Sequence, residues 1–277
     1  MEETFISEFT AMQFATNRNI RLHYKILGNG QPILLIPGLG LHSVPIARVA
    51  EELAISHRII VVDPRGAGQS AKPDTPYTAE IFVEDMVAVL DAAGVDRADV
   101  VGISMGGMIG QELAIQRPER VRALVLAVTY AAADAWVKQM WELRQGLIER
   151  LGLTEHFKLA LMFLFSPRSF ESEAALIATM RAGFASNPPD QVGYLRQLAF
   201  CRDHDAISRL FQIEAPTLVL SGADDLIAPQ HLGQQLAKGI PGAVLKVIAN
   251  APHLFMLSAP DQFAAIIREF LDRLGRA

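Results

Sequence analysis

Residues 100–111 read VVGISMGGMIGQ, and this stretch places Ser104 among four glycines directly after a run of apolar residues. Gly102, Ser104 and Gly106 fit the pattern G-x-S-x-G. Glycines let a strand and a helix approach where a Cβ atom would clash, and a serine at such a turn can stand exposed with a strained backbone. A capping serine in a glycine-rich turn would give the same letters. The surrounding sequence separates the two interpretations.

Short apolar runs surround this turn along the chain. They read PILLIP, RIIVVD, ADVVGI and VRALVLAV, at residues 32–37, 58–63, 98–103 and 121–128. Uninterrupted runs of this kind are typical of strands buried on both faces of a parallel sheet. Helical patterns lie between them, at residues 78–93, which Thr78 can cap, and at residues 105–117. The alternation predicts an α/β protein with a mostly parallel, doubly wound sheet, and it favours a nucleophile elbow at Ser104.

A long helical segment interrupts this alternation. After residue 128 the next buried-strand pattern, APTLVLSG, begins at Ala215. Helical patterns fill the interval, at residues 133–152, 153–165, 172–186 and 189–205. Such an insertion would lie over the carboxyl ends of the strands, where these folds bind ligands. We predict a core of residues 1–130 and 214–277, and an all-helical lid of residues 131–213 inserted after strand 6.

Composition and charge exclude several classes of protein. The chain has 277 residues, 51% of them hydrophobic, a net charge of −5 and no run of basic residues, so we expect no nucleic-acid partner. No apolar run approaches the ~20 residues that span a bilayer, and the acidic start MEETFISEFTAMQ is unlike a secretory signal. The single cysteine, Cys201, permits no internal disulfide. We expect a cytoplasmic protein without membrane association; no feature indicates its oligomeric state.

A nucleophilic serine requires a base, and His253 has the best position among seven histidines. It lies in NAPHLFMLSAP, after the last predicted strand and before the final helix at residues 260–275, so it shares a sheet edge with Ser104. The other histidines are expected at the surface or in structural roles. His23 lies in a half-exposed edge hairpin at residues 20–27, His57 precedes a strand at the opposite edge, His156 and His204 belong to the lid, and His231 is near a helix start.

A carboxylate that orients this base is expected just after a buried strand. LVLSGADDLIAP, residues 218–229, offers Asp224 and Asp225, although aspartate is also common in turns. Asp134 and Asp205, on the lid side, are weaker candidates. With Asp225, the order along the chain is Ser, Asp, His.

An acyl-transfer site also needs two N–H donors for the oxyanion. We expect them from Met105 and from Leu39 in the loop PGLGLHS, residues 37–43. The sequence has no Cys/His or carboxylate cluster that would suggest a metal, and no cofactor is expected. The residues predicted to contact a small-molecule substrate are Gly38, His42, Trp136, Trp141 and Phe163.

Four motifs together resemble the α/β-hydrolase superfamily over nearly the whole chain. They are PGLG from residue 37, DPRGAGQSAKP at residues 63–73, GISMGG from residue 102, and GADDLIAP followed by APH. The resemblance implies the fold of that family and a structural turn at residues 63–73. It also assigns the acid to Asp225 rather than Asp224, because the family's acid is the fourth residue of G-x-x-D-x-x-x-P. The family often has His-Gly before the oxyanion donor, whereas this chain has Pro37-Gly38.

The elbow and the predicted lid look most like those of bacterial enol-lactone hydrolases, aminoacrylate hydrolase-like proteins and small carboxylesterases. Ser104 excludes the haloalkane dehalogenases and epoxide hydrolases, which have aspartate at the elbow. The apolar lid favours an uncharged, moderately hydrophobic acyl or alkoxy group, and most lid arginines are expected on solvated helix faces: Arg144, Arg150, Arg168, Arg181 and Arg196. We therefore expect a serine hydrolase of a small ester or lactone. A C–C bond hydrolase, a cofactor-free haloperoxidase or perhydrolase, and a ligand-binding receptor stay open as alternatives.

Overall fold

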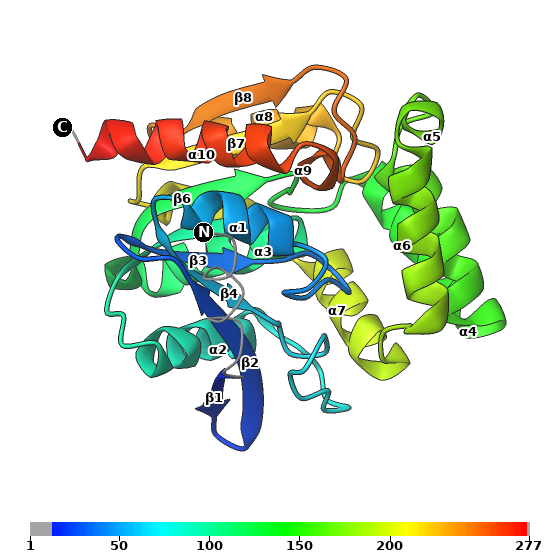
Figure 1. Ribbon diagram of the computed structural model, residues 1–277, viewed down its shortest axis with the longest axis horizontal. Coiled ribbons are helices and arrows are strands. Elements are labelled where there is room, and N and C mark those ends of the chain that lie inside the picture. Colours follow the sequence, from blue (N-terminus) through cyan, green and yellow to red (C-terminus); the bar gives the residue numbers. More distant parts are fainter. Residues whose placement is uncertain (1–12, 276–277) are drawn as a thin grey trace, which may run out of the picture.

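A single eight-stranded sheet runs through the protein, as seen in a computed structural model that describes residues 13–275 (Figure 1). The spatial order is β1-β2-β4-β3-β5-β6-β7-β8. β1 pairs antiparallel with β2, β2 pairs antiparallel with β4, and the remaining neighbours are parallel. The strands are β1 (Gln13–Asn17), β2 (Ile20–Leu27), β3 (Pro32–Ile36), β4 (Arg58–Val62), β5 (Ala98–Ile103), β6 (Val121–Ala127), β7 (Thr217–Gly222) and β8 (Val244–Ile248).

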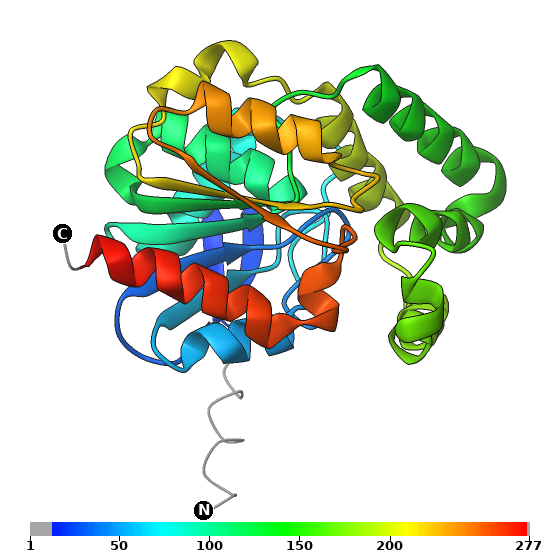
Figure 2. The ribbon, with the colours of Figure 1, turned by 90° about the horizontal axis from the view of Figure 1, so that it is seen from above.

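Helices cover both faces of this sheet (Figure 2). Side chains alternate along each strand, so neighbouring residues such as Leu34 and Leu35 enter different cores. One core packs against α1 (Ala47–Ala54) and α10 (Pro260–Leu274). The other packs against α2 (Ala79–Ala92), α3 (Met105–Gln116) and α8 (Gln230–Gly239). This arrangement confirms the predicted doubly wound α/β fold.

Four helices lie between β6 and β7 in the sequence: α4 (Ala135–Leu164), α5 (Ser169–Ser172), α6 (Ala174–Ser186) and α7 (Gln191–Asp203). Gly152, with φ of 80°, divides α4 into two helical parts, where two separate helices were predicted. A β-bridge between Ala132 and Asp205 joins the two ends of the segment. In Figures 1 and 2 the segment stands beyond the carboxyl ends of the parallel strands, beside the two helical layers.

One expectation about the edges of the sheet was wrong. Residues 20–27 were expected at an edge, but β2 lies one strand inside, because residues 13–17 add β1 outside it. His57 directly precedes β4, at the amino ends of the parallel strands and opposite the edge that carries Ser104, as expected. Both β2 and β4 are covered, and accordingly His23 and His57 are buried. None of the helices within residues 13–275 is both long and apolar enough to cross a membrane.

Candidate active site

Ser104 lies at the turn between β5 and α3, at the carboxyl edge of the sheet. Its φ of 55° and ψ of −116° belong to a region that non-glycine residues rarely adopt. The Ser104 amide donates to the Ala127 carbonyl over 2.9 Å, and the Ser104 carbonyl accepts from the Gly107 amide over 2.8 Å. These bonds hold the strained residue between β6 and the first turn of α3.

The flanking glycines are required by close backbone contacts. A Cβ atom at Gly102 would lie 2.3 Å from the Gly106 carbonyl oxygen, and one at Gly106 would lie 2.0 Å from the Ile36 carbonyl oxygen. A Cβ atom at Gly38, in the loop after β3, would lie 3.1 Å from Ser104 Cβ. Glycine at these positions therefore lets a strand, a helix and a loop meet around the serine.

A chain of hydrogen bonds connects Ser104 to a carboxylate through His253. Ser104 Oγ lies 3.0 Å from His253 Nε2. On the other side of the imidazole, His253 Nδ1 lies 2.8 Å from Asp225 Oδ2 and 3.0 Å from Oδ1. The structure thus brings together the three residues that the sequence pointed to, with the geometry by which a base activates a serine.

The Asp225 carboxylate is held in place by the loop after β7. Its Oδ1 accepts from the amides of Ile227 and Ala228 over 2.8 and 2.9 Å. Asp225 and His253 are each 3% exposed, so water competes little for these bonds. A Cβ atom at Gly222 would lie 2.3 Å from the Ala251 carbonyl oxygen, which shows how closely the acid loop and the histidine loop pack. Its two backbone hydrogen bonds and its contact with His253 therefore fix the orientation of the Asp225 carboxylate.

Two backbone amides near Ser104 have no protein acceptor within residues 13–275. They belong to Leu39, in the loop after β3, and to Met105, the first residue of α3. The first amides of a helix have no intrahelical partner, so the Met105 N–H is available to another acceptor. Both residues adjoin the Gly38–Ser104 contact. These are the two N–H groups that the sequence led us to expect as oxyanion donors.

Comparison with known proteins gives the family. The model for the alpha/beta hydrolase fold matches residues 31–260. The chain belongs to the α/β-hydrolase family. It is 33% identical to an Azorhizobium caulinodans protein named "Putative carbamate hydrolase RutD", over 96% of this chain and 100% of that one.

Solved structures of two named enzymes share the fold of this chain. The enol-lactonase from Burkholderia xenovorans LB400 is 28% identical, with a TM-score of 0.87 over 94% of this chain and 100% of the other. A thermophilic esterase from Thermogutta terrifontis is 27% identical, with a TM-score of 0.84 over 95% and 98%. The expected likeness to enol-lactonases and esterases is confirmed, and the chain is a hydrolase of this fold.

The remaining histidines of this hydrolase have other partners. His23 Nδ1 bonds Asp63 and His57 Nδ1 lies 2.9 Å from Ser56 Oγ, while the exposed His231, near the start of α8, pairs with Asp134. Burial lowers the pKa of His156 to about 3 and that of His204 to about 4, so both are neutral at pH 7. None of these lies against Ser104, as the sequence predicted. His42 is half-buried beside the turn at residues 63–68, and burial lowers its pKa.

The predicted substrate-contacting residues of the insertion differ in placement. Trp136 is 51% exposed, and its indole N–H donates to the Leu226 carbonyl over 2.9 Å, beside the acid. Trp141 is buried and donates to Tyr130 Oη over 2.7 Å. Phe163 is half-buried against the core. Both indoles are therefore bonded to protein, and contact of these residues with substrate stays a prediction.

The arginines between β6 and β7 agree with the expectation that most of them lie on solvated helix faces. Arg150, Arg168 and Arg181 are exposed and Arg196 is partly so, but Arg144 is only 3% exposed. Arg144 is the exception because α4 turns this side of its first half toward α7, where Arg144 Nη2 donates to Tyr194 Oη over 2.7 Å. Its neighbours in the chain are Leu143 and Gln145, and helical periodicity did not distinguish Arg144 from the exposed arginines.

Two residues of α7 that contact the loop at residues 37–43, Gln197 and Tyr194, were not predicted from the sequence. Gln197 Oε1 accepts from the Gly40 amide over 2.9 Å, and Gln197 Nε2 donates to the Arg65 carbonyl over 2.8 Å. The ring of Tyr194 lies against Gly40, where a Cβ atom would be 2.7 Å from Cε2. Helix α7 therefore fixes the loop that carries Leu39. No local pattern signals this contact, because the partners are 157 positions apart.

The turn at residues 63–73 is structural, as the resemblance implied. Asp63 accepts from the amides of Ser43 and Gln69 over 2.7 and 2.9 Å. Burial by itself raises the pKa of Asp63, but these amide bonds outweigh it and hold the pKa below its usual value. Through its bond to the Ser43 amide, the turn holds the end of the loop at residues 37–43, which carries Leu39.

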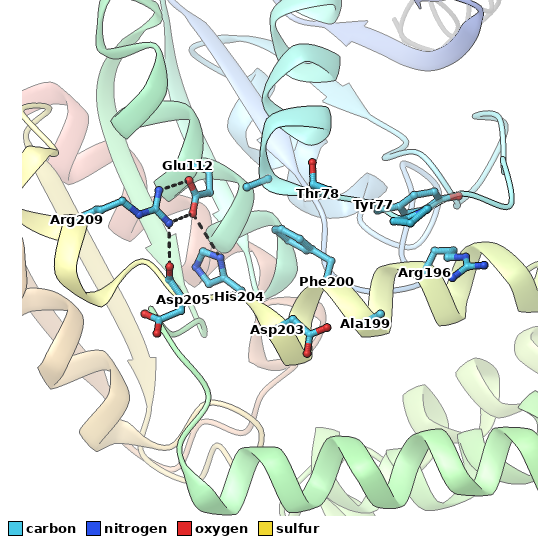
Figure 3. Close-up of a pocket in the computed structure, with 12 residues that line it drawn as sticks. Tyr77, Thr78, Glu112, Arg196, Ala199, Phe200, Asp203, His204, Asp205 and Arg209 are labelled. Carbon is cyan, nitrogen blue, oxygen red and sulfur yellow. Dashed lines mark hydrogen bonds and ion pairs between the residues drawn. The ribbon is translucent and has the colours of Figure 1, made fainter.

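A pocket of about 400 Å³ lies apart from these residues, between α2, α7 and η3 (Ile207–Gln212) (Figure 3). At one end Arg209 donates to both Glu112 oxygens over 2.7 Å. Arg209 and Gln116 thus satisfy the Glu112 carboxylate, and their hydrogen bonds offset the effect of burial on its pKa. Neither Ser104 nor His253 lines this pocket. Within residues 13–275 no cluster of His, Cys, Asp or Glu side chains could hold a metal ion.

Proposed function

We propose that this protein cleaves a carboxylic ester or lactone of a small, moderately hydrophobic molecule through an acyl-enzyme on Ser104. The observation that carries the proposal is the unbroken series from Ser104 Oγ through His253 to Asp225, with contacts of 3.0 and 2.8 Å. A serine hydroxyl is a weak nucleophile until a base takes its proton, and this arrangement supplies one.

In the first half-reaction, Ser104 Oγ attacks the substrate carbonyl carbon while His253 Nε2 takes the hydroxyl proton. The carbonyl oxygen becomes an oxyanion and accepts from the amides of Leu39 and Met105. Asp225 keeps the proton on His253 Nδ1 and stabilises the imidazolium. The bond from carbon to the alcohol oxygen then breaks, and His253 returns the proton to that oxygen. An acyl group remains on Ser104.

In the second half-reaction, water attacks the acyl carbon and gives a proton to His253. The intermediate collapses, Ser104 Oγ leaves and recovers the proton, and the carboxylic acid is released. With a lactone the alcohol stays covalently attached to the acid, so a single hydroxy acid results. No cofactor takes part in either step.

Residues 131–213 act in this proposal as a lid over the site. Trp136 from α4 bonds the loop of the acid at Leu226, and Gln197 from α7 bonds the oxyanion loop at Gly40. The segment therefore touches two loops of the site at once. Gly38, His42, Trp136, Trp141 and Phe163 remain the residues proposed to contact substrate.

Carbamate hydrolysis is a second candidate, because the Azorhizobium relative carries that name and aligns over nearly the full length of both chains. The same series of residues would cleave a bond from the carbamate carbonyl carbon. Ethyl carbamate against ethyl propanoate separates the two, since only the carbamate releases ammonia.

The testing experiment is hydrolysis of p-nitrophenyl esters from acetate to octanoate and of small lactones, by wild type and Ser104→Ala. Activity that disappears in the variant is expected, with an optimum of chain length that reports the size of the site. Folded wild type that cleaves none of them would contradict the proposal. A vinylogous diketone and a peroxide-dependent bromination assay then test the C–C hydrolase and haloperoxidase alternatives.

A further inference from the structure

Arg144 is a buried cation without an acidic partner. It lies in the first half of α4 with 3% of its surface exposed, and no carboxylate within residues 13–275 pairs with it. Arg65 shows the usual arrangement: it is 5% exposed, and its Nε and Nη2 donate to the two oxygens of Asp85 over 2.5 and 2.6 Å. A buried charge is costly unless it is paired, so Arg144 requires an explanation.

The protein groups around Arg144 are neutral. Its Nε donates to His156 Nε2 over 3.0 Å, and its guanidinium carbon lies 4.6 Å from the ring centre of Trp141. Burial, reinforced by the Arg144 charge, lowers the pKa of His156 to about 3, so this imidazole is an uncharged acceptor. Burial raises the pKa of Cys201 to about 12 and also raises that of Tyr194. None of these groups carries negative charge at pH 7.

Two donor groups of this cluster are unused. Arg144 Nη1 bonds no atom of the described chain, and it is not among the fully enclosed polar atoms that lack a partner. This nitrogen therefore keeps some accessible surface, and its N–H groups are free for another acceptor. Tyr194 Oη accepts from Arg144 Nη2 over 2.7 Å, and its own O–H donates to no described residue. A guanidinium edge beside a hydroxyl is a combination that recognises a carboxylate.

The cluster lies next to the loop of the candidate active site. The Tyr194 ring contacts Gly40 at one edge and Arg144 through its hydroxyl. Gly40 follows Leu39, and Gly38 on the other side of Leu39 approaches Ser104. One tyrosine ring thus separates the guanidinium from the oxyanion loop.

We infer that Arg144 and Tyr194 bind a carboxylate group of the substrate, so that the natural ester or lactone is an anion with an apolar middle. This inference rests on the proposed function, and it replaces the uncharged substrate that the sequence suggested. The carboxylate supplies the missing partner of the buried guanidinium. The reacting carbonyl is held at Ser104 at the same time, which sets the distance between the two groups of the substrate.

The test uses substrates matched in length that differ only at one end. Monoethyl succinate, glutarate and adipate each carry a terminal carboxylate; ethyl butanoate, pentanoate and hexanoate end in a methyl group. The measured quantity is the ratio of kcat/KM for each charged ester to that of its neutral counterpart. Enzymes are wild type, Arg144→Gln, Tyr194→Phe and the control Arg150→Gln, an exposed arginine of the same helix.

Wild type and Arg150→Gln are expected to prefer the charged ester of at least one length. In Arg144→Gln that ratio falls about 10- to 100-fold, mainly through KM, as expected for loss of a hydrogen-bonded charge. Tyr194→Phe lowers it less. A wild-type ratio near one at every length, or a ratio unchanged within twofold by Arg144→Gln, would overturn the inference.

Calorimetry separates this inference from the proposed function. Monoethyl glutarate is titrated into Ser104→Ala and into Ser104→Ala/Arg144→Gln. Binding that weakens at least 10-fold in the double variant supports the carboxylate site even if wild type hydrolyses no ester, in which case the proposed reaction alone fails. Equal binding, or none, to both proteins overturns the site even where wild type hydrolyses neutral esters through Ser104.

Discussion

Two buried histidine–aspartate pairs occur within residues 13–275, and one of the two belongs to the candidate active site. His253 Nδ1 lies 2.8 Å from Asp225, and His23 Nδ1 lies 2.9 Å from Asp63. All four residues are at most 3% exposed, and each carboxylate also accepts two backbone amides. By composition and burial the two pairs are nearly equivalent.

The difference lies at the other nitrogen of each imidazole. His253 Nε2 meets Ser104 Oγ at 3.0 Å, whereas His23 Nε2 is enclosed without a partner. A serine is present near His23 as well, but Ser70 Oγ accepts from the His23 backbone amide and donates to the Asp63 carbonyl. A serine next to a His–Asp pair is therefore insufficient. The strained strand–helix turn that aims the hydroxyl at the imidazole makes the difference.

The largest effect is expected from the exchange of His for Asn at both sites. His253→Asn removes the base, and we predict a loss of about 10⁶ in kcat. His23→Asn keeps a donor for Asp63, and kcat is expected to stay within threefold of wild type. Ester hydrolysis by both purified variants, with circular dichroism as the folding control, makes the comparison. Equal losses would mean that the two pairs do not differ in role.

The second largest effect on kcat is expected from the exchange of Asp for Asn at the two sites. Asp225→Asn presents an amide to His253 Nδ1 and disfavours the tautomer that leaves Nε2 as the base, so kcat should fall about 10⁴-fold. Asp63→Asn should change kcat far less, since its carboxylate holds a turn. Steady-state kinetics on the same ester measures both. Full activity of Asp225→Asn would contradict the assigned acid.

A smaller loss of kcat is expected from a change in the loop at residues 37–43, which carries Leu39 and contacts α7 through Gly40. Gly40→Ala forces the loop and the Tyr194 ring apart, because the new Cβ would lie 2.7 Å from the ring and φ is +70°. Displacement of the Leu39 donor by about 1 Å should lower kcat by up to ~10²-fold. Gly242→Ala, also at φ +70° but with no atom within 4 Å, controls for backbone strain. Equal kcat in both variants would contradict a role of this loop in catalysis.

The smallest effect concerns stability and its dependence on pH. Asp63→Asn should lower the free energy of unfolding by about 1–3 kcal/mol at pH 7. The folded-state pKa of Asp63 is lowered, so the carboxylate stabilises fully above its unfolded pKa and loses this effect as pH falls through the folded value. The difference between wild type and variant should therefore shrink below about pH 4. Urea unfolding between pH 7 and 3 measures it, and a constant difference would contradict the ionised role.

Local patterns in the sequence were enough to predict the parallel strands, the turn at Ser104 and the position of Asp225. Apolar runs of six to eight residues coincide with β3 to β7, and the spacing of glycines around Ser104 reflects contacts made within one strand–turn–helix unit. Asp225 and His253 follow strands directly, so their common edge could be deduced from topology.

Contacts between distant segments could not be predicted in the same way. Gln197 and Tyr194 reach Gly40 from α7, and the burial of Arg144 depends on how α4 packs against that helix. An arginine between an apolar and a polar residue, as Arg144 is between Leu143 and Gln145, gives the same pattern in a buried and in an exposed position. The β1 strand outside β2 likewise moved His23 from the expected edge into the core.

Covalent labelling tests the central claim most directly. Wild type, Ser104→Ala and His253→Asn are treated with a fluorophosphonate, and peptide mass spectrometry locates the adduct. We predict one adduct, on Ser104, formed rapidly in wild type, slowly in His253→Asn and not in Ser104→Ala, with Ser70 unmodified in all three. An adduct on another serine, or none on folded wild type, would contradict a serine nucleophile at the turn between β5 and α3.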